Sequence, residues 1–320
     1  MKKITAQAFM LSDDTIKDMT NDFAGKFQFS IRECKNALDN ARLVKIGHLN
    51  KQGSKEQFDI FDNIPVHLCN GYISGPSGSG KSTLIDLLAA DRLLKGDNVI
   101  ILDLCMGNPH IPHHLPVAHS MLVDIGASYL KFGLRMENLD ITPELENRCA
   151  IFDFSGYYEN YDAFRPGNHI RPLVVFNEIV SRVITYLSDL NRYINDNGRR
   201  TFIFIDEGDK LLSYSSSADL AIRRLYTESK KINTGVFITT YHTNFSLEKY
   251  IQYDIIFNNS SLFFGLEDWN WITTQAGRPA KRIVLVGRES LTGKDIIAFN
   301  FEKDFINESA KNKLRKILKK

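Results

Sequence analysis

The sequence predicts an α/β fold in which helices flank a mainly parallel sheet, with a small N-terminal helix and hairpin region and a C-terminal β-hairpin. Short apolar runs of strand length alternate with longer segments whose apolar residues recur at helical spacing. The run at 98–104 is almost continuously apolar, as in a strand buried on both faces of a parallel sheet. A glycine-rich segment at 75–82 stands between a strand-like run and a helical segment, which is the arrangement of a phosphate-binding loop.

Composition and charge limit the classes of function. Of the 320 residues, 43% are hydrophobic and 24% are charged, which is ordinary for a soluble globular protein. The formal net charge of +2 argues against a protein that binds nucleic acid over most of its surface, so any DNA contact must be local. Cys34, Cys69, Cys105 and Cys149 are widely spaced and form no C-x-x-C pair. This spacing indicates a reducing compartment and favours neither a disulfide framework nor a zinc site.

The beginning of the chain is interpreted as an accessory region. A capping box at Ser30 and Glu33 predicts a short amphipathic helix, and segments 42–49 and 57–61 flank a polar turn and predict a hairpin. No signal-peptide pattern and no apolar run of ~20 residues is found, so we expect a cytoplasmic protein. The expected regions are 1–64 for the accessory region, 65–302 for the main α/β domain and 303–320 for a basic C-terminal tail.

The glycine-rich loop matches G-x-x-x-x-G-K-[ST] at every fixed position. A strand is expected at 66–73 before it and a helix at 82–94 after it. Glycines let backbone N–H groups curl around phosphates, and the helix N-terminus adds unpaired N–H groups and partial positive charge. Lys81 is expected to reach the β- and γ-phosphates, and the Ser82 hydroxyl to ligate Mg²⁺. The residues expected to bind ATP are Gly75, Pro76, Ser77, Gly78, Ser79, Gly80, Lys81, Ser82 and Thr83.

The remaining elements follow in alternation. Residues 105–145 are rich in His, Pro and polar side chains and are interpreted as an excursion from the sheet. After residue 254 the residue pattern predicts strands. The expected elements are strands at 98–104, 150–154, 202–205 and 236–240, helices at 176–194 and 218–232, and a hairpin of 282–286 with 295–301.

Four histidines in the excursion raise the question of a metal site. They are His110, His113, His114 and His119. Prolines interleave them, and no acidic or cysteine partner stands beside them in the sequence. These features favour a plain loop over a metal site.

Two adjacent carboxylates end the apolar strand at 202–205. Asp206 is expected to hold Mg²⁺, directly or through water, together with Ser82. At a strand end the chain can turn the second carboxylate, Glu207, toward the γ-phosphate, where it orients and deprotonates the attacking water. The alternative is a solvated acidic turn. We interpret Glu207 as the catalytic base, because a protein that only senses nucleotide does not need it.

Three further residues complete the candidate catalytic set. Thr240, at the end of the strand at 236–240, is a candidate contact to the γ-phosphate or its water; a strand that simply runs into a polar loop accounts for it equally well. Arg223 and Arg224, on the helix before this strand, are candidates for a finger that reaches a neighbouring subunit's nucleotide. Solvated helix arginines are the alternative.

The order of these segments resembles the FtsK/HerA class of DNA-pumping ATPases, over about residues 65–265. The similarity is greatest to the motor domains of conjugation (type IV secretion) ATPases and viral genome-packaging ATPases. It implies an oligomeric ring, DNA as a partner and contact with a portal, capsid or secretion channel. It also places the strand at 236–240 between the two motif strands. The segments that carry it are the loop at 75–82, the sequence Phe204–Leu212, the basic helix with Arg223, Arg224, Lys230, Lys231 and Asn233, and the strand at 235–240.

The sequence departs from the family in two places. An aromatic residue is frequent in the family where Asp209 stands, and a glutamine where Tyr241 stands. The last ten residues, Lys311–Lys320, include six basic and no acidic residues, and Leu314, Ile317 and Leu318 share a helical face. This segment is a candidate contact to DNA or to an anionic membrane surface, and a frayed solubilising tail is the alternative.

The sequence therefore predicts an Mg²⁺-dependent ATPase that oligomerises and moves DNA, in the cytoplasm or recruited to a membrane or a virion assembly site. The first alternative is an AAA-type assembly or loading factor that recruits partners without translocating. The second is a small-molecule kinase, which the adjacent Asp206 and Glu207 disfavour.

Overall fold

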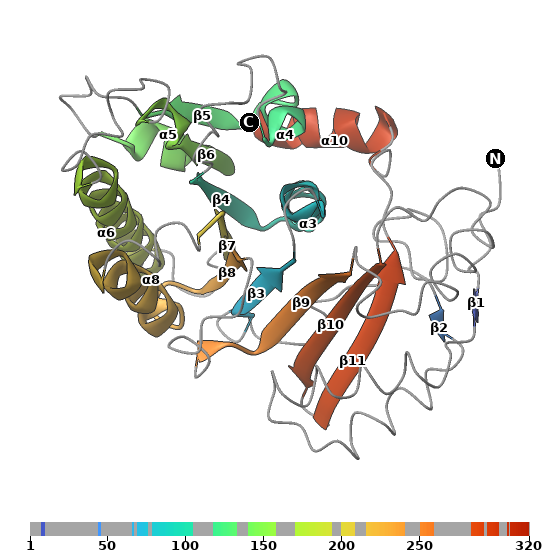
Figure 1. Ribbon diagram of the computed structural model, residues 1–320. Coiled ribbons are helices and arrows are strands. Elements are labelled where there is room, and N and C mark those ends of the chain that lie inside the picture. Colours follow the sequence, from blue (N-terminus) through green and yellow to red (C-terminus); the bar gives the residue numbers. More distant parts are fainter. Residues whose placement is uncertain are drawn as a thin grey trace. The chain divides into compact units, whose positions relative to one another are not determined.

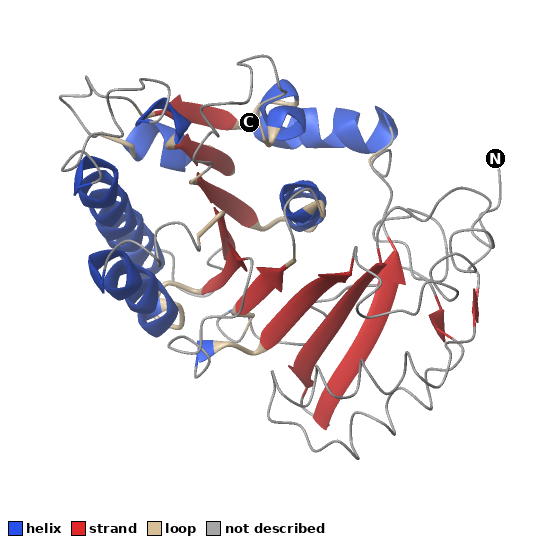
Figure 2. Cartoon of the chain, viewed as in Figure 1, coloured by secondary structure: helices blue, strands red, loops and turns tan. Residues whose placement is uncertain are grey.

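The structure of the chain is a computed structural model, whose described helices and strands are coloured in Figure 2. The helix expected from Ser30, the segment 57–61 and the residues His110, His113 and His114 lie outside the described residues. The structure describes residues 8–9, 44–45, 66, 69–75, 79–104, 118–132, 140–157, 170–193, 200–208, 216–240, 250–258, 283–290, 293–300, 306 and 308–319.

Two compact units make up the chain. Unit 1 comprises Met1–Ile64, Tyr72–Lys81 and Gln252–Ile306. Unit 2 comprises Pro65–Gly71, Ser82–Ile251 and Asn307–Lys320. In the described part of the chain, no helix is both long and apolar enough to cross a membrane.

Unit 1 contains short antiparallel pairings. Strand β1 (Ala8–Phe9) pairs with β2 (Val44–Lys45). Strand β10 (Ile283–Ser290) pairs with both β9 (Tyr253–Asn258) and β11 (Gly293–Asn300). The β10–β11 pair confirms the C-terminal hairpin that the sequence predicts.

A parallel sheet forms the centre of unit 2, as predicted (Figure 1). Its strands run β8-β7-β4-β6-β5. Strand β3, of which Gly71 alone belongs to unit 2, pairs with β8 and gives six parallel strands. Strand β8 therefore lies between β3 and β7, the position that the resemblance implies. The strands are β3 (Gly71–Ser74), β4 (Asn98–Asp103), β5 (Ser128–Lys131), β6 (Cys149–Asp153), β7 (Thr201–Asp206) and β8 (Thr234–Thr240).

Helices cover both faces of this sheet, which explains the continuous apolar runs in its strands. Helices α6 (Ile170–Tyr193) and α8 (Ser216–Glu228) lie on one face, and α3 (Lys81–Leu94) lies on the other (Figure 1). Every residue of β7 and β8 is buried. Phe204 stacks on Phe237 of the neighbouring strand with 5.8 Å between ring centroids. Together the two layers hold the carboxyl ends of the strands in fixed positions.

A buried amide fixes the start of β3 beside β8. Asn70 accepts a hydrogen bond from the backbone N–H of Val236 at 2.9 Å and donates to the Ser229 hydroxyl at 3.3 Å. Its side chain is buried, so the loss of either bond would leave a desolvated polar group. Asn70 thus sets the register of the strand that leads into the glycine-rich loop.

The described residues within 105–145 include a strand of the sheet, so the interpretation of this stretch as an excursion from the sheet was wrong for that part. Residues 118–132 and 140–146 contain the short helices α4 (Ser120–Asp124) and α5 (Thr142–Glu146) and the strand β5, which is a sheet strand. A four-residue strand at the end of the sheet, half exposed, has no apolar run that would reveal it.

The basic C-terminal segment forms a packed helix. Helix α10 (Glu308–Leu318) buries Leu314 fully and Leu318 almost fully, the two leucines on the predicted apolar face. The Leu318 side chain lies against Gly126, where an added Cβ would be 3.5 Å from its own. The segment is therefore part of unit 2, and the frayed-tail alternative is wrong.

Candidate functional site

Three carboxylates meet at the carboxyl ends of adjacent strands. The register of the parallel pairs sets Asp103 of β4 opposite both Asp153 of β6 and Asp206 of β7. All three side chains are buried. In open parallel sheets ligands bind outside this edge, so the acidic row lies where a bound group would be expected.

Asp206 is held in place by hydrogen bonds from two residues. Its Oδ1 accepts hydrogen bonds from the Thr239 hydroxyl at 2.6 Å and from the backbone N–H of Glu207 at 3.0 Å. Burial works to raise the pKa of Asp206, but the charge of His119 and the hydroxyls of Ser82 and Thr239 outweigh it and hold the pKa at about 2. Asp206 is therefore ionised at neutral pH and held in one position.

Ser82 and Asp206 form a pair that fits Mg²⁺. Ser82 lies in the first turn of α3, and its hydroxyl is close enough to Asp206 to lower the pKa of that carboxyl. A hydroxyl and a carboxylate are the hard oxygen ligands that Mg²⁺ takes in proteins, usually with water and substrate phosphates as the rest. The two residues predicted to be metal ligands are thus neighbours in space, although 124 positions separate 82 from 206 in the sequence.

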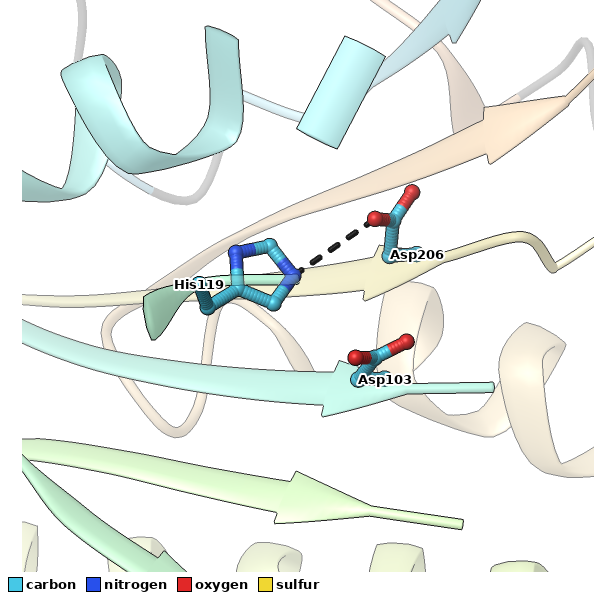
Figure 3. A group of neighbouring side chains, drawn as sticks. All are labelled: Asp103, His119 and Asp206. Atoms are coloured by element: carbon cyan, nitrogen blue, oxygen red, sulfur yellow. Dashed lines mark ion pairs between the residues drawn. The ribbon is translucent and has the colours of Figure 1, made fainter. Parts of the chain in front are cut away.

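His119 lies in a turn, as a loop position predicts, but it has acidic partners that the sequence analysis did not find. It precedes α4, has a left-handed backbone (φ 62°) and is 2% exposed. Its Nδ1 lies 2.5 Å from Asp86 Oδ1 on α3, and its Nε2 lies 3.5 Å from Asp206 Oδ2 (Figure 3). The acidic partners come from α3 and β7, far away in the sequence, so local spacing could not reveal them.

Charge around His119 favours its protonated form. Burial works to lower the pKa of the imidazole, but the carboxylates of Asp86, Asp206 and Asp103 raise it well above its ordinary range. Figure 3 shows the imidazole facing Asp206, with Asp103 on the neighbouring strand. The buried negative charge of this edge is thus partly balanced by one imidazolium.

Glu207 lies at a sharp turn after β7. Its backbone is left-handed (φ 56°), so the chain leaves the strand direction at the residue where a turn was expected. Its N–H also donates to the Thr239 hydroxyl at 2.6 Å, and Gly208 N–H donates to Thr239 O at 3.0 Å. A Cβ on Gly208 would approach Ile238 Cδ1 to 2.3 Å, so this position needs glycine unless Ile238 moves. β8 therefore fixes the orientation of Glu207.

Two neighbouring threonines of β8 have different contacts. The sequence analysis selected Thr240, whereas Thr239 contacts the acidic pair. Thr239 bonds both Asp206 and the Glu207 backbone. Thr240 is also fully buried, but its hydroxyl has no hydrogen-bond partner among the described residues. Adjacent strand residues point to opposite faces, which explains why only one of them reaches Asp206. Nothing in the sequence distinguished Thr239 from Thr240 as the residue that contacts Asp206.

The glycine-rich loop is described in part, because Pro76, Ser77 and Gly78 lie outside the described residues. Lys81 Nζ donates to the backbone O of Gly75 at 2.8 Å, so the lysine folds back along its own loop. Gly80 has a left-handed backbone (φ 104°) that a side chain would strain.

The helix that follows this loop presents a suitable end for an anion. Helix α3 begins at Lys81, and its first turn, which includes Thr83, has no acidic side chain. Just before it, the Ser79 hydroxyl is buried with no hydrogen-bond partner among the described residues. Unpaired N–H groups and the partial positive charge of a helix N-terminus favour a phosphate at such a place.

The two candidate arginines both have partners within the chain. Arg223 Nε bonds Asp219 Oδ2 at 2.7 Å along α8, and Arg224 Nη1 bonds the Ser181 hydroxyl of α6 at 3.1 Å. Arg224 is exposed, whereas Arg223 is half-buried. A role for either in a neighbouring subunit's site remains a proposal.

The strand order agrees with the fold class that the sequence predicts. The glycine-rich loop follows β3, the acidic pair Asp206 and Glu207 stands at the end of β7, and β8 lies between these two strands. A parallel sheet with flanking helices is the fold of this part of the chain. It carries the additional strand that the sequence analysis expected.

Comparison with solved structures finds FtsK/HerA-type ATPases, the class that the sequence resembles. The cytoplasmic domain of the type VII secretion ATPase EccC from Thermomonospora curvata is 11% identical, with a TM-score of 0.45 over 72% of this chain and 25% of that one. This chain thus spans about a quarter of the length of that EccC domain. The DNA-packaging ATPase B204 from Sulfolobus turreted icosahedral virus is 16% identical, with a TM-score of 0.41 over 72% and 97%.

A third match is the conjugation coupling protein TcpA of pCW3, whose structure holds ATPγS. It is 15% identical, with a TM-score of 0.38 over 79% of this chain and 66% of that one. No protein-family model matches the sequence, and no curated protein matches it.

Proposed function

We propose that this chain is an Mg²⁺-dependent ATPase that assembles into a ring and moves DNA. One observation carries the catalytic part: a single β8 hydroxyl, that of Thr239, bonds both the Asp206 carboxylate and the backbone of Glu207. Asp206 is thereby held as a metal ligand, and Glu207 follows it at a fixed turn. A solvated acidic turn would not need this support from the neighbouring strand.

Each residue of the site has a role in this proposal. Lys81, which bonds Gly75 O in the structure, swings to the phosphates and neutralises their charge. Ser82 and Asp206 would hold Mg²⁺, which would supply positive charge that stabilises the charge developing on the transferred phosphoryl group. Glu207 orients the attacking water and removes its proton. Thr240 is the proposed contact to the γ-phosphate.

An oligomer is part of the proposal because an ATPase of this kind completes its site with an arginine from a neighbour. Mixing an Arg224→Ala protein with a Lys81→Ala protein tests this directly. The first supplies an intact nucleotide site and the second supplies the arginine, so the mixture should hydrolyse ATP when neither protein does alone. Arg223→Ala is tested in the same way. Turnover that is independent of protein concentration, with no complementation, would remove the ring from the proposal.

The proposal that DNA is the substrate rests on the resemblance and on the basic residues of α8 and α10. DNA of any sequence should stimulate hydrolysis, and the stimulation should fall steeply with salt because phosphate contacts release counterions. A displacement assay on long DNA separates a translocase from a loading factor. Stimulated hydrolysis without strand movement would favour the loading factor, and a portal, capsid or secretion-channel partner would then be sought by co-purification.

The exposed side of α10 is the proposed tether to DNA or to an anionic membrane. Lys313 and Lys316 are exposed on it, whereas Leu314 is buried. The double substitution Lys313→Glu and Lys316→Glu therefore tests the tether without removing the packed helix. Weaker binding to DNA or to anionic vesicles with unchanged basal hydrolysis is expected. Loss of hydrolysis would instead show that this face serves the motor.

A further inference from the structure

Asp103, His119 and Asp206 gather at the carboxyl ends of β4 and β7 (Figure 3). One ligand atom from each lies within 4.8 Å of the others, and all three residues are buried. We propose that these three side chains form a binding site for a divalent transition-metal ion. It would share Asp206 with the Mg²⁺ site but differ from it in having a nitrogen ligand.

The state of the imidazole is the first argument. His119 Nε2 is buried and makes no hydrogen bond to any described residue. At 3.5 Å its contact with Asp206 Oδ2 is too long for a good hydrogen bond. A buried nitrogen left in this way carries an energetic cost unless another group satisfies it. A metal ion between the nitrogen and the two carboxylates would do so.

The separation of the ligand atoms is the second argument. Two ligand atoms about 2.1 Å from one ion and at a tetrahedral angle are about 3.4 Å apart. The distance between His119 Nε2 and Asp206 Oδ2 is 3.5 Å, close to that value. The ligand atom of Asp103 lies within 4.8 Å of both of these atoms.

A second carboxylate behind the histidine is the third argument. Asp86 Oδ1 lies 2.5 Å from His119 Nδ1, on the side of the ring away from Asp206. Histidine ligands of metals commonly place their other ring nitrogen on a carboxylate, which fixes the ring and raises its basicity. Asp86 holds Nε2 toward Asp103 and Asp206, and the left-handed backbone of His119 allows this orientation.

The ligand set indicates the class of ion. Imidazole nitrogen suits Zn²⁺, Co²⁺ and similar transition metals, whereas Mg²⁺ takes oxygen ligands. With Nδ1 of His119 on Asp86, the lone pair of Nε2 would form the bond to the metal. The positive charge of the ion would balance the carboxylates of Asp103 and Asp206.

Co²⁺ is a suitable probe because its visible absorption reports tetrahedral nitrogen and oxygen coordination. The full chain without nucleotide is titrated with Co²⁺ and should show saturable absorption at one ion per chain. His119→Ala should abolish the signal, and the isosteric Asp103→Asn should weaken binding. Asp86→Asn keeps all three ligands and should cost about 10–100-fold in affinity.

Controls separate this site from other binding. Asp124→Asn changes an exposed carboxylate on α4 and should bind Co²⁺ as the wild type does. The triple substitution of His110, His113 and His114 by alanine should also leave the signal unchanged. Each variant is compared at equal folded fraction, measured by thermal melting.

Each result of the Co²⁺ titrations either supports or contradicts the metal site. Unaltered binding by His119→Ala and Asp103→Asn, or loss of binding in the triple histidine variant, would overturn the proposal. So would the absence of any saturable signal in the folded wild type. Lys81→Ala should bind Co²⁺ normally, so failure of the metal site and failure of the proposed ATPase function give different results.

Discussion

Replacing Thr239 by valine removes one hydroxyl and keeps the shape of the side chain. In the structure this hydroxyl donates to Asp206 at 2.6 Å and accepts the Glu207 N–H at 2.6 Å. A hydrogen bond to a charged group contributes about 1.5–3 kcal/mol, and its loss leaves Asp206 short of one donor. We expect the free energy of unfolding to fall by about 2 kcal/mol, which lowers Tm by roughly 4–8 °C.

Thr240→Val is the matched control. This threonine is the next residue of the same strand and is equally buried, but its hydroxyl has no partner among the described residues. Removal of a buried hydroxyl without a partner should leave stability unchanged or raise it by up to about 1 kcal/mol. If Thr240 contacts the γ-phosphate, the same variant should hydrolyse ATP more slowly while remaining fully stable.

Urea unfolding followed by circular dichroism gives the two free energies, and a phosphate-release assay gives the two rates. The expected pattern is a destabilised Thr239→Val protein and a stable Thr240→Val protein. Equal stabilities would show that Thr239 does not support the site. A larger loss in Thr240→Val would show that the two side chains are assigned to the wrong faces of β8.

Three further predictions concern the catalytic glutamate, the C-terminal helix and acid stability. Glu207→Gln should bind ATP normally and turn over at least ~10²-fold more slowly, as equilibrium binding and phosphate release will measure; collapsed binding would make Glu207 structural. Leu314→Ala should cost about 2–5 kcal/mol in urea unfolding because Leu314 is fully buried, whereas the exposed Lys316→Ala should stay within about 0.5 kcal/mol; similar values would mean that α10 is not packed. The pKa of Asp206 is held at about 2 against an ordinary value of 3.8, so its contribution of about 2 kcal/mol is present above pH 4 and is lost as the pH falls toward 2. Asp206→Asn should therefore lose less stability over that range in pH-dependent unfolding, and an identical profile would contradict the assignment.

The sequence predicted most of the sheet because buried parallel strands have an unmistakable composition. Strand β7 and strand β8 were expected at 202–205 and 236–240 and occur at Thr201–Asp206 and Thr234–Thr240. Their apolar runs are long, and turn residues bound them. Strand β5 was missed because four half-exposed residues at the end of a sheet carry no periodicity.

The site was predictable only where a motif is continuous in sequence. Lys81, Ser82 and Asp206 belong to such motifs, and the structure brings Ser82 and Asp206 together. His119 and Asp86 were missed because they meet through the packing of α3 against the turn before α4. Asp103 was predictable from the sequence, because it ends an apolar strand as Asp206 does. Parallel strands end at the same edge of a sheet, so the two carboxylates were bound to be neighbours.

Nucleotide binding and hydrolysis, measured side by side on wild type, Lys81→Ala and Glu207→Gln, test the central claim most directly. The wild type should bind Mg²⁺·ATP and hydrolyse it, Lys81→Ala should lose activity together with tight binding, and Glu207→Gln should bind without turnover. Hydrolysis by Lys81→Ala at the wild-type rate, or no binding of ATP by the folded wild type, would contradict the account.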